Sequence, residues 1–168
     1  MILPFKHKIP RIHSSAFVAP DAMVIGDVEI GEDASIWYGA VLRGDVNFIR
    51  IGARTNIQDG TIVHVSSEEH PTVLEEEVTV GHRVTLHGCC VERECLIGIG
   101  AILLDGVRIG RNSLVAAGSL VTPGVVIPPN SMVMGAPAKV KRLLTADELA
   151  GLRTSWNNYI ELKNAYLG

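Results

Sequence analysis

Aliphatic residues return at every sixth position over most of this chain. The longest unbroken series runs from Val91 to Val133, and earlier series begin at Val18, Ile51 and Leu74. The residue four places after each aliphatic position is usually small or β-branched, as at Ala34. An α-helix does not return one face at an interval of six, and the strands of an ordinary sandwich alternate with a period of two. A short strand followed by a turn, repeated in one direction, has the observed period, which indicates a β-solenoid.

The repeat also predicts how the coils close and stack. Three hexapeptides make one coil, and successive coils lie about 4.8 Å apart, the spacing of neighbouring strands. The aliphatic position and the residue four places later point inward. We therefore expect an all-β solenoid, a parallel β-helix, over about residues 12–140, interrupted by a loop at 66–71. The whole chain, residues 1–168, is expected to form a single domain.

The pattern becomes helical after Val133. The segment 134–139 ends the solenoid, and Thr145 with Glu148 has the spacing of a capping box. Apolar side chains and the stem of a lysine then share one helical face: Leu149, Leu152, Trp156, Tyr159, Ile160 and Lys163. We expect a C-terminal α-helix over about 145–165 that lies along the solenoid wall.

Composition and charge narrow the classes of function. The chain is 47% hydrophobic but only 5% aromatic, which suits a narrow interior of Val, Ile and Leu. The net charge of −3 favours neither nucleic acid nor an anionic membrane as a partner. No apolar run is long enough to span a bilayer, and the N-terminus lacks the apolar core of a signal peptide. We expect a cytoplasmic protein.

Three cysteines lie close together in the sequence. By the sixfold count Cys90 and Cys95 take the small inward position, and Cys89 points outward. Small buried thiols are the favoured interpretation for the first two. A thiolate ligand at Cys89 is the less favoured alternative.

Three histidines are placed by the same count. His64 and His87 each follow an inward aliphatic residue, and two hexapeptides plus the loop separate them, so both point outward on one face of adjacent coils. His82 falls on the preceding face, near a corner, and cannot easily join them within one chain. A threefold homotrimer would place one chain's His82 beside the His64 and His87 of its neighbour. The alternative is that these are solvated surface side chains.

Nitrogen ligation by His64, His82 and His87 suits Zn²⁺, and Fe²⁺ or Co²⁺ would also fit. Three protein ligands leave a fourth position open, which is the arrangement of a catalytic zinc.

Four polar side chains on the preceding coils are candidates for supporting roles: Arg43, Asp45, Gln58 and Asp59. All point outward by the same count. An Arg43–carboxylate pair across the trimer interface would fix the register of the subunits, and Gln58, in the phase of His64, is placed to bind a metal-bound water. Surface salt bridges are the simpler alternative.

The segments Arg43-Gly44-Asp45, Asn56-Ile57-Gln58-Asp59 and Gly81–His87 resemble the γ-class carbonic anhydrases of the hexapeptide-repeat family, and the resemblance extends over nearly the whole chain. It implies a left-handed parallel β-helix, a homotrimer, and zinc held by His64 and His87 of one subunit and His82 of the next. It also implies hydration of carbon dioxide to bicarbonate. The chain departs from the founding branch at Val46, where that branch has a glutamate credited with proton transfer.

Two other functions remain open at the level of sequence. Hexapeptide solenoids with a similar 134–139 segment also occur in acyl-CoA-dependent acetyltransferases, in which one histidine acts as general base. A non-catalytic metal-binding trimer is the other alternative, and the fold alone does not decide among them.

Overall fold

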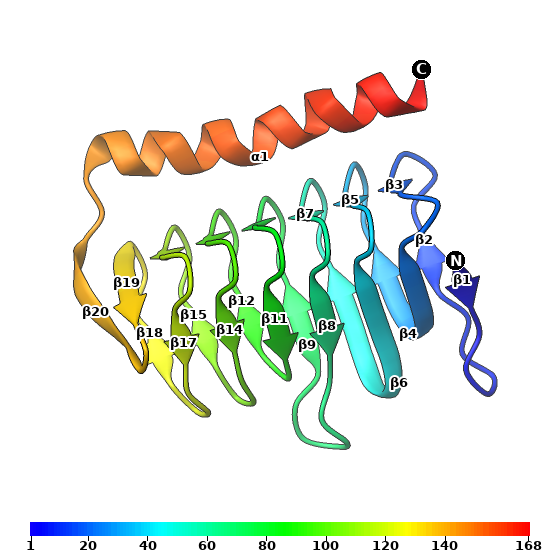
Figure 1. The fold of residues 1–168 in the computed structure, drawn as a ribbon, viewed down its shortest axis with the longest axis horizontal. Coiled ribbons are helices and arrows are strands. Elements are labelled where there is room, and N and C mark those ends of the chain that lie inside the picture. Colours follow the sequence, from blue (N-terminus) through cyan, green and yellow to red (C-terminus); the bar gives the residue numbers. More distant parts are fainter.

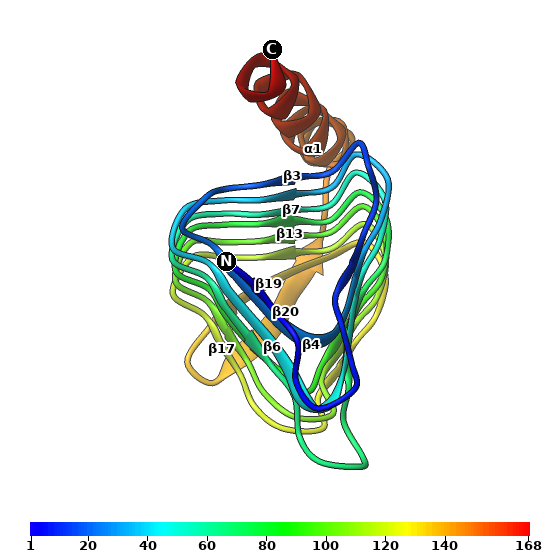
Figure 2. The same cartoon turned by 90° about the vertical axis from the view of Figure 1, so that its right-hand side faces the viewer.

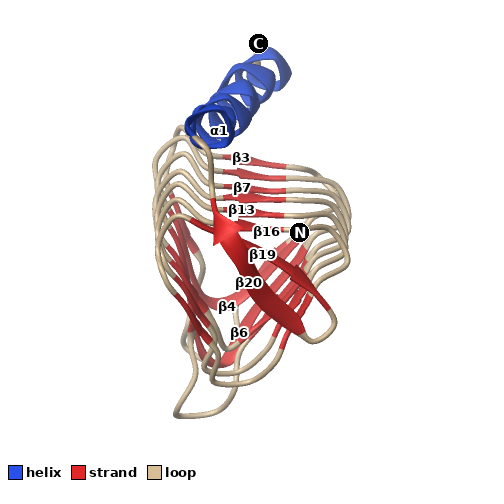
Figure 3. Cartoon of the chain, turned by 90° about the vertical axis from the view of Figure 1, so that its left-hand side faces the viewer, coloured by secondary structure: helices blue, strands red, loops and turns tan.

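Short parallel strands stack coil upon coil to form a three-sided solenoid in the computed structural model, which describes all of residues 1–168 (Figures 1 and 2). Turns separate the strands at the corners, and a single helix lies outside the solenoid (Figure 3). The parallel solenoid with one C-terminal helix confirms the prediction from the sixfold pattern.

The strands form three walls. The first wall contains β1 (Ile2–Leu3), β8 (Ile62–His64), β11 (Thr85–His87), β14 (Ile102–Leu103) and β17 (Leu120–Val121). The second wall contains β2 (Arg11–Ile12), β9 (Thr72–Leu74), β12 (Cys90–Val91), β15 (Arg108–Ile109) and β18 (Val126–Ile127). The long strands β4 (Met23–Ile30) and β6 (Val41–Ile51) continue around the corner and join these two walls into one sheet.

The third wall is a separate sheet. It contains β3 (Phe17–Val18), β5 (Ser35–Ile36), β7 (Asn56–Ile57), β10 (Thr79–Val80), β13 (Leu96–Ile97), β16 (Leu114–Val115), β19 (Ser131–Gly135) and β20 (Ala138–Leu143). All its pairings are parallel except that of β19 with β20, which closes the C-terminal end.

The interior is a continuous column of the predicted aliphatic residues. On the first wall Leu42, Val63, Leu86, Leu103 and Val121 stack in register, and each is fully buried. Burial of one such side chain contributes about 1.5–3 kcal/mol. The column therefore fixes the register of every coil, and with it the outward positions that alternate with the core.

A bulge interrupts the repeat where nine residues, not six, separate Leu42 from Ile51. Gly26 pairs with Gly44, but the next pair is Val28 with Ile49, so residues 45–48 of β6 lie opposite Asp27 alone. These additional residues are accommodated at the corner between the first and second walls. Gly44 is required there because a Cβ on it would lie 2.6 Å from the backbone oxygen of Asp27.

The cysteine assignment was wrong for two of the three positions. Cys89 is buried, whereas Cys90 is only partly buried and pairs in register with Arg108. Only five residues separate Leu86 from Val91, so the inward position two residues before the aliphatic residue is Cys89. Cys95 is buried as predicted, and burial raises the pKa of the Cys89 thiol to about 12.

Helix α1 (Ala146–Leu167) runs back along the outside of the third wall toward the N-terminal coil (Figure 1). Thr145 and Glu148 form the capping box. Leu152 packs with Met132 near the start of the helix, and at the other end the buried Lys163 ammonium lies 3.0 Å from Asp33. The helix is not long and apolar enough to cross a membrane.

Candidate metal centre

His64 and His87 lie side by side on the first wall. They are partners in the parallel pairing of β8 with β11, and each follows a fully buried aliphatic residue, so both imidazoles point outward. His64 Nδ1 lies 3.1 Å from His87 Nε2. The structure thus brings together two of the three predicted histidines, on the face and in the order that the count gave.

The outer ring nitrogens of both histidines contact carboxylates. His64 Nε2 lies 3.0 Å from Asp45 Oδ1, and His87 Nδ1 lies 2.6 Å from Asp105 Oδ1. A carboxylate accepts, so each outer nitrogen carries a proton. When both rings are neutral, the two inner nitrogens present lone pairs to each other, an arrangement that a cation between them stabilises.

The spacing of the inner nitrogens fits one tetrahedral metal ion. Two Zn–N bonds of about 2.0–2.1 Å at a tetrahedral angle place the nitrogens about 3.3 Å apart. The observed 3.1 Å separation of His64 Nδ1 and His87 Nε2 is close to that value. Carboxylates on the outer nitrogens of ligating histidines are the usual second partners at zinc sites, since they fix the tautomer and the ring orientation.

Asp45 reaches His64 because of the bulge in β6. The additional residues there place Asp45 at the corner beside β8, and Asp45 also accepts from the Arg43 guanidinium and from the Val46 N–H at 2.8 Å. Burial opposes the charge on Asp45, but the hydrogen bonds from His64 and Arg43 outweigh it and the pKa of Asp45 is lowered. Arg43 therefore has a carboxylate partner within its own chain.

Asp105 was not found from the sequence. Leu86 pairs with Leu103 on the next coil, so Asp105 lies one residue beyond the position that stacks on His87, and its side chain reaches the histidine from there. Its Oδ2 accepts from Ser66 Oγ at 2.9 Å. Burial raises the pKa of Asp105, but the hydrogen bonds from His87 and Ser66 lower it further than burial raises it. The sixfold count did not point to Asp105, because the position that stacks on His87 is Leu104.

The structure places His82, Gln58 and Asp59 at a different corner, between the third and first walls. His82 Nδ1 lies 2.9 Å from Asp59 Oδ2, and both side chains are exposed. Gln58 is buried and donates from Nε2 to Asn56 Oδ1 at 3.1 Å. The shared phase of Gln58 and His64 does not bring them together within one chain, since they follow strands of different walls.

The candidate residues thus form two separate groups at opposite edges of the first wall. We call Arg43, Asp45, His64, His87 and Asp105 the paired-histidine group, and Gln58, Asp59 and His82 the single-histidine group. Within one chain no set of three His, Cys, Asp or Glu side chains is arranged to hold a metal ion.

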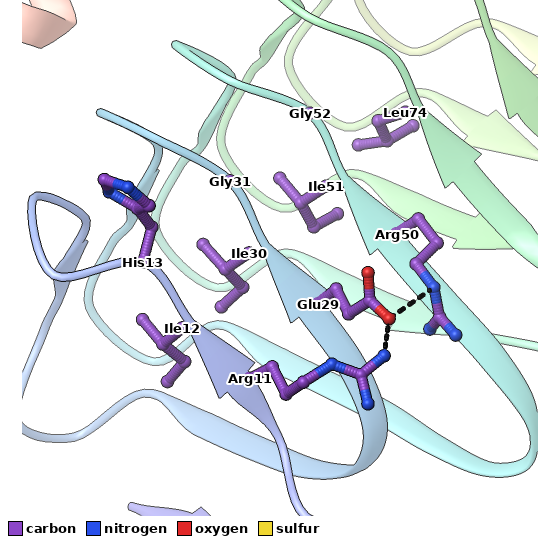
Figure 4. A pocket seen from close by; sticks show the side chains of 10 residues that line it. All are labelled: Arg11, Ile12, His13, Glu29, Ile30, Gly31, Arg50, Ile51, Gly52 and Leu74. Carbon is purple, nitrogen blue, oxygen red and sulfur yellow. Dashed lines mark ion pairs between the residues drawn. The ribbon is translucent and has the colours of Figure 1, made fainter.

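The largest hollow on the surface lies elsewhere. It has a volume of about 420 Å³ and is flanked by His13 and by Glu29, which lies between Arg11 and Arg50 (Figure 4). Gly31 and Gly52 are among its lining residues. None of the residues predicted from the sequence to act at a site lines this hollow.

Comparison with known proteins gives one family match and many similar sequences. The model of the bacterial transferase hexapeptide (six repeats) matches residues 10–44. The mitochondrial γ carbonic anhydrase 1 of Arabidopsis thaliana is 49% identical over 164 residues, which are 95% of this chain and 60% of that protein. The carbonic anhydrase of Geobacillus kaustophilus is 49% identical over 166 residues, which are 99% of this chain and 91% of that protein. The chain therefore spans about 60% of the plant relative but nearly all of the bacterial one.

A solved structure from Bacillus cereus, described as a candidate acetyltransferase, has the same fold. It is 46% identical, covers 99% of this chain and 96% of its own, and superposes with a TM-score of 0.97. Proteins similar to this chain thus bear the names of two different activities.

Proposed function

Because the chain belongs to the γ-class carbonic anhydrase family of hexapeptide-repeat proteins, we propose that it hydrates carbon dioxide to bicarbonate at zinc sites between subunits. The active form in this proposal is a left-handed β-helical homotrimer in the cytoplasm, each chain acting as one domain. The observation that carries the proposal is the 3.1 Å approach of two inner ring nitrogens whose outer nitrogens are held by carboxylates.

The separation of the two groups supports a shared site. The paired-histidine group supplies His64 Nδ1 and His87 Nε2, and the single-histidine group supplies His82, whose Nδ1 is engaged by Asp59 and whose Nε2 is left for a ligand. When a neighbouring subunit covers the first wall, the paired-histidine group of one chain meets the single-histidine group of the next. A closed ring of three chains then contains three equivalent sites.

The surface between the two groups supports an interface there. Outward residues on the first wall stack in register, and two apolar ones on either side of Thr85 are exposed: Ile62 by 42% and Ile102 by 38%. An exposed apolar patch bordered by polar groups is typical of an association surface. Covering this patch with another copy brings an edge of the neighbour to the histidines.

Each polar residue has a role in the proposed reaction. When bound, zinc supplies Lewis-acid activation that lowers the pKa of water to about 7. Asp45, Asp59 and Asp105 hold the three imidazoles in the tautomer that offers a lone pair to the ion. Gln58 uses its Nε2 toward Asn56, so its Oε1 remains to accept from the attacking water and orient it. Arg43 fixes Asp45.

The route of the released proton follows from what surrounds the site. Val46 is 52% exposed and carries no ionisable group. The loop of residues 65–71 after β8 offers Glu69 and His70, and Glu69 Oε2 lies 3.9 Å from His70 Nε2. We assign proton release to this loop, with the partly exposed imidazole of His70 as the proton carrier.

The test is metal analysis of anaerobically purified protein combined with stopped-flow hydration assays on the zinc- and iron-loaded forms. The proposal expects one metal ion per chain and a rate of bicarbonate formation well above buffer. Fully occupied metal with no rate above buffer rejects the enzymatic function and leaves a non-catalytic metal-binding trimer.

An acetyltransferase is the second candidate, favoured by the description of the Bacillus cereus structure. A general base needs one histidine, and it gains nothing from a second imidazole whose lone pair faces it at 3.1 Å. Consumption of acetyl-CoA in the presence of an amine or hydroxyl acceptor, unchanged in a His87→Ala variant, would favour transfer over hydration.

A further inference from the structure

We infer that Asp105 is the positioning residue for the proposed metal ligand His87, and that it sets the affinity of the paired-histidine group by holding the His87 proton on Nδ1. The inference rests on the proposed metal site. It concerns a residue that lies outside the three segments in which the resemblance to the family was found.

Both oxygens of the Asp105 carboxylate are engaged. Oδ1 lies 2.6 Å from His87 Nδ1, and Oδ2 accepts from Ser66 Oγ at 2.9 Å. With both oxygens fixed, the carboxylate cannot rotate away from the imidazole without breaking a hydrogen bond. The side chain is 36% exposed, so the contact is partly sheltered from water.

The chain makes room for this contact at Gly88. Gly88 has φ +59, and a Cβ built on it would lie 2.3 Å from Asp105 Oδ1 and 2.7 Å from the Cβ of His70. Any side chain at this position would occupy the space through which Asp105 approaches the wall. The glycine directly after His87 therefore leaves the space that the Asp105 carboxylate occupies.

The same arrangement occurs at the other two histidines. Asp45 holds the outer nitrogen of His64 and Asp59 holds that of His82. Three histidines, each with its own carboxylate from a different segment of the chain, form a pattern that isolated surface salt bridges do not explain. Asp105 completes it.

The consequence for metal binding follows from tautomer chemistry. A neutral imidazole carries one proton, which is on either Nδ1 or Nε2. With Asp105 accepting from Nδ1–H, the Nε2 lone pair faces His64 Nδ1, where it is needed. Without the carboxylate, the tautomer with its proton on Nε2 and other orientations of the His87 ring become populated. The proton and the ring must both return to their original positions before a metal binds. Loss of such a partner typically costs about 10–100-fold in metal affinity.

The test compares Asp105→Ala, Asp105→Asn and a control, Asp147→Ala, which removes an exposed carboxylate on α1. Zinc dissociation constants are measured by competition with a chromophoric chelator. We expect zinc affinity about 10–100-fold weaker in Asp105→Ala. Asp105→Asn, whose Oδ1 still accepts from Nδ1–H, should lose less, and the control should match the wild type.

A second readout needs no metal and no activity. Long-range ¹H–¹⁵N spectra of the metal-free protein report the tautomer of His87. The wild type should show the proton on Nδ1, and Asp105→Ala should show a mixture. A proton on Nε2 in the wild type overturns the inference, even if the alanine variant fails to fold.

The two proposals fail in distinguishable ways. Wild-type protein that binds no zinc rejects the metal site, whatever the tautomer of His87. Wild-type protein that binds zinc, with Asp105→Ala binding it equally tightly, rejects the role of Asp105 and leaves the metal site standing.

Discussion

His64 Nδ1 and His87 Nε2 lie 3.1 Å apart although twenty-three residues separate them in the chain. A regular coil has eighteen residues, as the pairing of Leu103 with Val121 shows. The loop at 65–71 projects from the solenoid and absorbs the additional length (Figure 1). The strands before and after it therefore keep their register, and His87 remains over His64.

Replacing either paired histidine should remove the metal and leave the fold intact. His64→Ala and His87→Ala should each retain less than about a tenth of the wild-type zinc, because only two of the three histidine ligands remain at each site. Their neighbours Val63 and Leu86 stay buried, so far-UV circular dichroism and the midpoint of denaturant unfolding should change little. His13→Ala, away from the site, is the control, and unfolding of either site variant would show that the metal is structural.

Gly44→Ala should damage the site through the backbone. Its Cβ would lie 2.6 Å from the Asp27 oxygen, so the bulge must shift and Asp45 must move from His64. We expect the free energy of unfolding to fall by about 1–3 kcal/mol and zinc affinity to fall with it. Gly151→Ala on α1, where a Cβ meets no atom within 4 Å, is the control and should be neutral or stabilising. Unchanged zinc affinity in Gly44→Ala would contradict the role of the bulge.

Arg43→Ala should weaken self-association more than it weakens the protomer. The Arg43 side chain is 46% exposed in the single chain and lies beside Asp45 at the edge of the proposed interface. We expect the trimer dissociation constant to rise at least about tenfold, which corresponds to about 1.4 kcal/mol. Sedimentation velocity over a dilution series measures this dissociation constant, and Arg93→Ala, a change of another exposed arginine, is the control. Identical profiles for Arg43→Ala and wild type would count against a role of Arg43 at the interface.

The docking of α1 should depend on pH through Asp33. A hydrogen bond from the buried Lys163 ammonium is the main reason that the pKa of Asp33 is lowered. A lowered pKa in the folded state gives stability that is present above the unfolded value of about 3.9 and is lost as pH falls through the folded value. Asp33→Asn should therefore be less stable at pH 7 by about 1–3 kcal/mol.

The difference between wild type and Asp33→Asn should shrink as the pH falls below about 4, where Asp33 of the unfolded chain becomes protonated, and should disappear below the lowered pKa of Asp33 in the folded protein. Denaturant unfolding at a series of pH values measures this difference. Asp147→Asn, which changes an exposed carboxylate on α1, serves as the control. A difference that stays constant down to the lowest pH at which the protein folds would contradict the ion-pair explanation.

The sequence predicted the solenoid because its core repeats, and each inward residue faces the same environment as the one a coil away. It also placed His64 over His87, since both follow core positions. It misplaced Cys89 and Cys90 where one residue is missing from the repeat, because a single deletion moves the inward position by one. It did not find Asp105, whose contact with His87 depends on the space left at Gly88 and not on any local pattern.

Restoration of metal sites by mixing two inactive variants tests the shared site most directly. His82→Ala and His64→Ala protomers each lack one ligand, and neither alone should bind metal. A mixed ring of three chains contains one complete junction, between His82 of the His64→Ala chain and His64 with His87 of the His82→Ala chain. Random co-refolding of equal amounts gives mixed rings in about three cases of four, so metal content should rise to about one quarter of the wild-type value. Trimers that demonstrably mix and remain metal-free would show that the site is not shared between chains.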